Sequence, residues 1–412
     1  MEEFRSRLRV DLRSFDAYIS QHNSVSHFAH FYLHASGLFY GYAKQRQFCL
    51  FADADTWNEA DHFKISLIEG FFLTYFIHQK ERYSSVQDGS YESLIRECLQ
   101  KIFDFYVLFT MTDSQSVKYR NLFIHSSSIQ KTVEEVFDNR VNNPSMLRLD
   151  FWKGSQFNIF SGLDLMYFAL WLEGDYAYDR RTQLHDCIIR LMTIACEKES
   201  IRNNGKALVA YFISSGNYDA KDFAGKYSID FEKYNASEKN VVRRLLYEYA
   251  VYTCLIDNSL SVSEVLLLQE ISRSFKLDED KAQQSLITIE NFLLLYGDKI
   301  FFLQYGEGLD VIKKAFFNRS YAFIQKNKTK IVTEIMESKE LVELLRKSRR
   351  NDLSEMEKAK VREQILDVLK TIPSLAIFMI PGGAILLPIL FKILPEELIK
   401  PSSFINKSSS DA

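Results

Sequence analysis

Apolar side chains recur every three or four residues through most of the chain, which is the pattern of α-helices that bury one face. Leu94, Ile95, Cys98, Ile102 and Tyr106 show this spacing. The pattern predicts amphipathic helices over residues 3–21, 25–46, 57–80, 90–111, 127–141 and 183–199. We therefore expect an all-α fold of multi-helical bundles, with an N-terminal helical domain over residues 1–230.

The prolines are distributed unevenly along the chain. Of the six, only Pro144 precedes residue 373. The other five are Pro373, Pro381, Pro388, Pro395 and Pro401. Because proline lacks an amide hydrogen and interrupts helices, its near absence from the first 372 residues permits long helices there. Its clustering near the end predicts a different local architecture for the tail.

Capping signals mark a helical unit over residues 235–300. Two residue pairs have the spacing of a capping box at a helix start, namely Asn235 with Glu238 and Ser261 with Glu264. The first helix should end near residues 257–258, the second near Phe275, and a third should begin near Asp278. This succession resembles the TerB-like fold of tellurite-resistance proteins, with Asn258 where that family has glycine. Ordinary capping between two helices explains the same residues.

The C-terminal tail combines a capped helix with a long apolar segment. A helix should cover residues 353–371, with Asp352 or Ser354 as its N-cap. No charge occurs from Ile372 to Phe391, and that length is enough to cross a bilayer. Three prolines and a pair of glycines interrupt the segment, however, and broken helices leave backbone groups unpaired in lipid. The pattern favours a proline-broken helical hairpin that packs on other helices.

The spacing of these prolines resembles the C-terminal domain of the LETM family, the leucine-zipper, EF-hand-containing transmembrane proteins. The similarity begins at an L-S-x-x-E motif and ends at a P-S-S-F motif, which assigns residues 351–408 to a LETM-like domain. The matching residues are Leu353, Glu357, Asp367, Pro373, Pro381, Pro388, Pro395, Pro401 and Phe404. The overall layout is similar to bacterial LETM-related proteins that are associated with biofilms.

The resemblance implies two possible roles. The C-terminal domain of the family is described as ribosome-binding-like, and full-length members are tied to the exchange of potassium or calcium for protons at the inner mitochondrial membrane. Ala384 stands here where many members have an acidic residue, and no uncharged run precedes the domain. We therefore expect a non-catalytic protein that binds the ribosome or another macromolecule. A membrane-associated factor for cation homeostasis, with residues 372–394 against lipid, is the alternative.

Residues 311–350 are locally basic, with eleven positive and four negative side chains. We expect residues 301–350 to form a basic helical connector that contacts phosphates of RNA or an anionic membrane surface. The candidate contact residues are Lys326, Lys328, Lys330, Arg346, Lys347, Arg349 and Arg350. A solvated helix face, with the neighbouring aromatic residues turned to the core, explains the same pattern.

Composition and the N-terminal sequence indicate the cellular compartment. The formal net charge of −3 gives no overall indication of nucleic-acid binding. The five cysteines are scattered and form no CxxC pair, which favours a reducing compartment over a disulfide framework. The N-terminus is charged and lacks the apolar core of a secretory signal. We expect a cytoplasmic protein that is either free or peripheral at the inner membrane.

Residues with ligating or catalytic chemistry form no recognisable site in the sequence. His27, His30 and His34 share one face of the helix expected over residues 25–46. Three histidines on one helix can supply two metal ligands, so a metal site would also require a carboxylate from elsewhere. A helix–helix contact explains this spacing, so we predict neither metal nor cofactor. No motif combines a nucleophile, a base and an orienting group, so we predict no enzyme, with an unrecognised helical enzyme as a further alternative.

Overall fold

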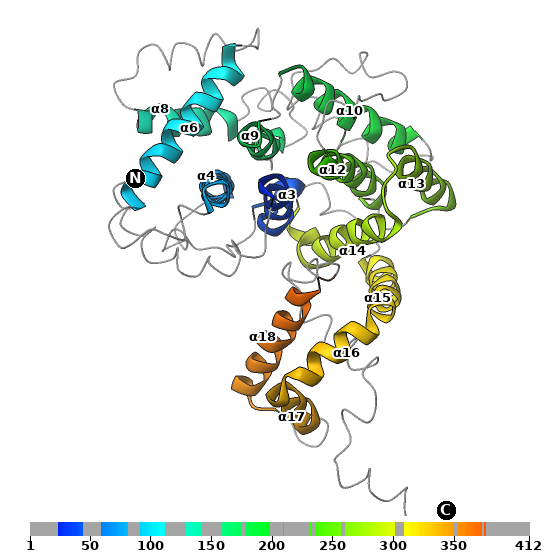
Figure 1. Cartoon of the computed structure of the whole chain (residues 1–412). Helices are drawn as coiled ribbons and strands as arrows, with labels where there is room; N and C mark the ends of the chain where they lie inside the picture. The colour runs from blue at the N-terminus through cyan, green and yellow to red at the C-terminus, as the bar shows by residue number, and fades with distance from the viewer. Residues whose placement is uncertain are drawn as a thin grey trace, which may run out of the picture. The chain divides into compact units, whose positions relative to one another are not determined.

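The computed structural model of the chain describes residues 24–43, 59–80, 91–111, 129–141, 159–174, 178–197, 236–256, 260–300, 309–348 and 353–372, together with Val209, Phe231 and Leu375. These residues form thirteen α-helices and no strand, which confirms the all-α prediction (Figure 1). The helices are α3 Val25–Ser36, α4 Glu59–His78, α6 Tyr91–Met111, α8 Ile129–Val141, α9 Leu163–Leu172, α10 Tyr178–Glu197, α12 Ala236–Leu255, α13 Val262–Ser274, α14 Glu279–Tyr296, α15 Leu309–Lys326, α16 Lys328–Glu337, α17 Lys339–Ser348 and α18 Glu355–Thr371.

The chain divides into two compact units. The first unit consists of residues 1–277 and 298–306 and contains α3 to α13. The second unit consists of residues 278–297 and 307–412 and contains α14 to α18. The helical unit expected over residues 235–300 is divided between them, because α14 packs on α15.

Three helices at the centre of the first unit, α3, α4 and α9, are buried around most of their circumference. Helix α3 contacts α4, α9 and α12, and α4 also contacts α9 (Figure 1). All residues of α9 from Leu163 to Leu170 are buried, as are residues 66–77 of α4. A helix that is apolar on every side is typical of a protein interior, so these three helices form the core on which the outer helices pack.

The N-terminus of α3 is capped from a distant part of the chain. Oε1 of Glu173, which follows α9, accepts hydrogen bonds from the Val25 amide at 2.8 Å, the Ser26 amide at 3.2 Å and the Ser24 hydroxyl at 3.0 Å. The carboxylate satisfies amides that have no partner within the helix and complements the positive end of the helix dipole. This contact fixes α3 relative to α9.

The second unit is built around a separate apolar core. In α16 and α17, buried side chains repeat every four residues and pack with α18, so the three helices enclose one continuous cluster. The repeating residues are Ile331 and Ile335 of α16, Leu341 and Leu345 of α17, and Val361, Ile365 and Leu369 of α18. Helix α14 is joined to α15 by an ion pair between the buried carboxylate of Glu290 and the guanidinium of Arg319.

Most of the predicted helices are present with similar bounds. The helices expected over residues 57–80, 90–111, 127–141, 183–199 and 353–371 correspond to α4, α6, α8, α10 and α18. Two predicted starts are confirmed by their caps. Ser261 and Glu264 form the capping box of α13, and the Asp278 carboxylate accepts hydrogen bonds from two amides of α14.

One predicted helix has a wrong end, and one helix of the structure was not predicted. The helix expected over residues 25–46 ends at Ser36, because Gly37 adopts a left-handed conformation with φ of 89° and closes it. Helix α9 was not predicted, because a helix buried on all sides has no alternation of polar and apolar residues to detect. The helix expected over residues 3–21 and the proline-broken hairpin lie outside the described residues, apart from the buried Ile372 and Leu375.

The close packing of α4 gives a testable prediction. A Cβ atom on Gly70 would approach Cε1 of Tyr32 on α3 to 2.7 Å and Cδ2 of Leu165 on α9 to 2.9 Å. Gly70→Ala should therefore lower the free energy of unfolding by about 1–3 kcal/mol through overpacking, even though alanine favours helix. Thermal unfolding followed by circular dichroism measures the change. Glu270→Ala on the exposed side of α13 is the control, and a stability of Gly70→Ala equal to wild type would contradict the contact.

Candidate functional site

Two histidines of α3 and one glutamate of α12 meet inside the first unit. His30 and His34 are four residues apart, so both imidazoles lie on the face of α3 that packs against α12. Nε2 of His30 is 2.5 Å from Oε2 of Glu248, and Nε2 of His34 is 3.0 Å from the same oxygen. The side chains of His34 and Glu248 are 2% and 0% exposed. We call these three residues the α3–α12 cluster.

Neighbouring side chains fix the orientation of this cluster. Nε of Arg244, one turn before Glu248 on α12, donates a hydrogen bond of 2.9 Å to Oε1, the other oxygen of Glu248. Nδ1 of His34 lies 2.8 Å from the hydroxyl of Tyr40, and the Phe39 ring stacks on the His34 imidazole with 4.4 Å between centroids. The Glu248 carboxylate and the His34 ring are therefore each held from two sides.

Burial decides the charge states in the α3–α12 cluster. It lowers the pKa of His30 from 6.5 to about 4, because the imidazolium would be desolvated, and Glu248 opposes this only in part. For Glu248, burial acts to raise the pKa, but the facing histidines and the Arg244 guanidinium outweigh it and hold the pKa well below its usual value. At neutral pH, His30 is therefore a neutral imidazole beside a carboxylate whose charge is balanced by Arg244.

The sequence identified the histidines but not their partner. Of the three histidines that the sequence places on one helical face, His30 and His34 are buried at a helix–helix contact, and His27 is exposed. Glu248 lies 218 residues from His30 in the chain, so no local spacing connects them. One signal was available, since Glu248 is the single acidic residue in the apolar run 245–252, where an unpaired charge would be costly. The carboxylate that a metal site would require is therefore present in the fold.

The predicted basic residues lie on three consecutive helices of the second unit. Lys326 is in the last turn of α15, Lys328 and Lys330 are in the first turn of α16, and Arg346 and Lys347 are in the last turn of α17. Nζ of Lys326 is 3.1 Å from the Asp280 carboxylate, and Nζ of Lys347 is 2.5 Å from that of Glu357. Within the described ranges, Lys328 and Lys330 have no carboxylate partner. Arg349 and Arg350 lie outside those ranges.

The residues that carry the LETM resemblance have structural positions where the fold describes them. Leu353 is half-buried against the apolar core of the second unit. Glu357 is the third residue of α18 and forms a capping box with Ser354, while Asp367 is on the exposed side of that helix. The remaining residues of the set lie beyond the described part of the chain and are Pro373, Pro381, Pro388, Pro395, Pro401 and Phe404.

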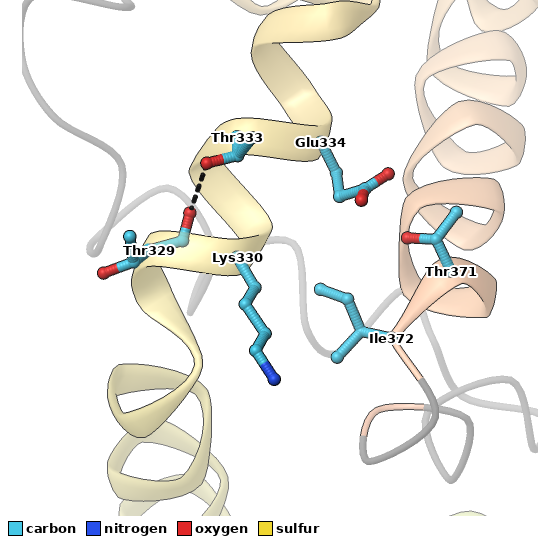
Figure 2. A pocket seen from close by; sticks show the side chains of 6 residues that line it. All are labelled: Thr329, Lys330, Thr333, Glu334, Thr371 and Ile372. Carbon is cyan, nitrogen blue, oxygen red and sulfur yellow. Dashed lines mark hydrogen bonds between the residues drawn. The ribbon is translucent and has the colours of Figure 1, made fainter.

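A small groove lies between α16 and the end of α18, as Figure 2 shows. Its volume is about 260 Å³, and its lining residues are Thr329, Lys330, Thr333, Glu334, Thr371 and Ile372. The hydroxyl of Thr333 is turned to its own helix, where it donates a hydrogen bond of 3.0 Å to the carbonyl of Thr329. The groove is smaller than the usual range for organic ligands and carries both signs of charge, so we assign it no ligand.

Among the helices that the structure describes, none is both long and apolar enough to cross a membrane. Comparison of the chain with protein-family models, with curated proteins and with solved structures gives no match. The LETM-like and TerB-like resemblances therefore rest on the sequence motifs alone.

The capping box of α18 predicts a pH dependence. Hydrogen bonds from Lys347 and from the backbone and side chain of Ser354 lower the pKa of Glu357 from 4.5 to about 2. A carboxyl group whose pKa is lower in the folded state stabilises the fold above its unfolded pKa, and that contribution is lost as the pH falls through the folded pKa. Glu357→Gln should thus be less stable than wild type above pH 4.5, and the difference should vanish near pH 2.

Urea unfolding of both proteins across this pH range measures the difference. Glu343→Gln, on the exposed side of α17, is the control and should follow wild type throughout. A difference for Glu357→Gln that stays constant from neutral pH down to pH 2 would show that the capping box contributes nothing through its charge.

Proposed function

We propose that this chain is a non-catalytic binding protein whose second unit docks on the ribosome through lysines of α16 and α17. The observation that carries the proposal is the set of ammonium groups on Lys328, Lys330 and Lys339, which have no carboxylate partner within the described ranges. They are carried by two consecutive helices that pack on a shared apolar core. Fixed cations on rigid helices suit a partner with regularly spaced phosphates.

The paired lysines add to this surface. Lys326 and its partner Asp280 are 52% and 56% exposed, and Lys347 is 50% exposed. Exposed ion pairs contribute little to stability because water and salt screen them, so their lysines are available to exchange a carboxylate for a phosphate. Binding to RNA phosphates also releases condensed counterions, which makes such an interaction favourable at low salt and sensitive to added salt.

The LETM-like motifs support a docking role for the same unit. Leu353 precedes the N-cap of α18 and Glu357 lies in its first turn, and this helix packs against the two helices that carry the lysines. The family's C-terminal domain is described as ribosome-binding-like, and this resemblance favours the ribosome over other polyanions. The membrane-associated alternative would place the same lysines on anionic lipid headgroups, and the experiment below separates the two.

Co-sedimentation of the full chain with ribosomes at increasing salt tests the proposal. Lys328→Glu combined with Lys330→Glu should weaken binding by about tenfold or more and flatten its salt dependence, because phosphate contacts are lost and replaced by repulsion. The control is Arg96→Glu combined with Arg273→Glu, which makes the same change in net charge on exposed sites of the first unit.

Each outcome has a clear meaning. The control variant should bind within about twofold of wild type, because exposed charges away from the contact act only through weak long-range attraction. If both double variants lose binding equally, overall charge rather than the α16–α17 surface is responsible, and the proposal is wrong. If wild type sediments with vesicles of anionic lipid but not with ribosomes, the membrane-associated role replaces it.

A further inference from the structure

We infer that His30, His34 and Glu248 form a binding site for a first-row divalent metal ion, with Zn²⁺ as its most suitable occupant. The sequence predicted no metal, and this inference departs from that expectation because the fold supplies the missing carboxylate. The ligand atoms of the three residues all lie within 4.8 Å of one another. Two imidazoles and one carboxylate are a ligand set that zinc uses when three protein groups and one water complete its coordination.

The distances in the α3–α12 cluster are close to those of a bound site. Around a tetrahedral zinc ion with bonds of about 2.0–2.1 Å, neighbouring ligand atoms are about 3.3 Å apart. The two imidazole nitrogens are now 2.5 and 3.0 Å from the Glu248 oxygen. The two contacts with Glu248 must lengthen by less than about 1 Å, and the two imidazole nitrogens, which lie within 4.8 Å of each other, must adjust to the same spacing.

Metal binding through Nε2 sets the tautomer of each histidine. Metal binding at Nε2 of His30 requires its ring proton to be on Nδ1, whereas a neutral imidazole that donates to Glu248 carries it on Nε2, so this ring must change tautomer. Metal binding at Nε2 of His34 requires its ring proton to be on Nδ1, and the adjacent Tyr40 hydroxyl can accept a hydrogen bond from it as readily as donate one. Such an outer hydrogen bond fixes the ring of a metal-bound histidine.

Arg244 has two opposite effects on the site. It binds Oε1 of Glu248 and so directs Oε2 toward the histidines, in the way that outer residues orient ligating carboxylates. Its positive charge also disfavours a second cation nearby. The Arg244 side chain is 19% exposed, so water partly screens that charge. The position on two packed helices, with every ligand buried, favours retention of the ion once it is bound.

The test uses the full chain stripped with a chelator and then loaded with Zn²⁺ alone. After gel filtration, elemental analysis should find about one zinc ion per chain, and Co²⁺ in its place should give the visible absorption bands of a site with few ligands. His30→Gln and His34→Gln should weaken zinc binding by about 100-fold or more, measured by competition with a chromophoric chelator. Glutamine keeps an N–H that can donate to Glu248, so the helices should still pack.

The matched control is His27→Gln, which changes an exposed histidine on the same helix and should leave zinc binding unchanged. The inference would be overturned if all three variants lost zinc affinity equally. It would also be overturned if wild type retained no more zinc than His30→Gln. If neither buried variant folds, the cobalt spectrum of wild type decides, since a chain that acquires no such bands has no site. Because ribosome binding is not measured here, this result is independent of the proposed function.

Discussion

The enclosure of α3 is the constraint on which the first unit depends. A helix inside a protein must find a partner for every polar group that it carries, because water is excluded. Its N-terminal amides bind Glu173 after α9, the Tyr32 hydroxyl donates to Glu69 of α4, and His30 faces Glu248 of α12. Each partner comes from a different neighbour, so satisfying α3 also sets the register of the three helices around it.

In the first unit, arginine side chains offset the charge of two buried carboxylates. Asp164 on α9 is fully buried and accepts two hydrogen bonds of 2.7 Å from Arg140 on α8, with a third from the Tyr106 hydroxyl. Glu248 has the same kind of support from Arg244 on one oxygen. A buried ion pair adds little net stability over an apolar contact, but removing one partner leaves a costly charge. Such pairs therefore specify which helices meet more than how strongly they do.

The fold was predictable from sequence where the determining contacts are local. Ser261 with Glu264 and Ser354 with Glu357 form capping boxes between residues three apart, so the helix starts can be recognised without knowing the rest of the fold. Helix α9 was not predicted because its residues are apolar on all sides and so show no helical periodicity. The α3–α12 cluster was predicted only in part, because Glu248 meets His30 only through tertiary packing. For the basic residues, composition located the charges but could not show that Lys326 pairs with Asp280.

The two units differ in how charge can act on a partner. In the α3–α12 cluster of the first unit the charged and polar groups are buried, so their effect depends on a few fixed distances, and one substitution that changes a ligand atom is enough to remove it. In the second unit Lys326, Lys330, Lys339 and Lys347 are exposed, so in the proposed contact each would contribute a small screened attraction, and their effects would add. A metal site and a polyanion surface therefore place opposite demands on a fold. The fixed geometry inside the first unit suits the proposed metal site, and the accessible cations on the helices of the second unit suit the proposed polyanion contact.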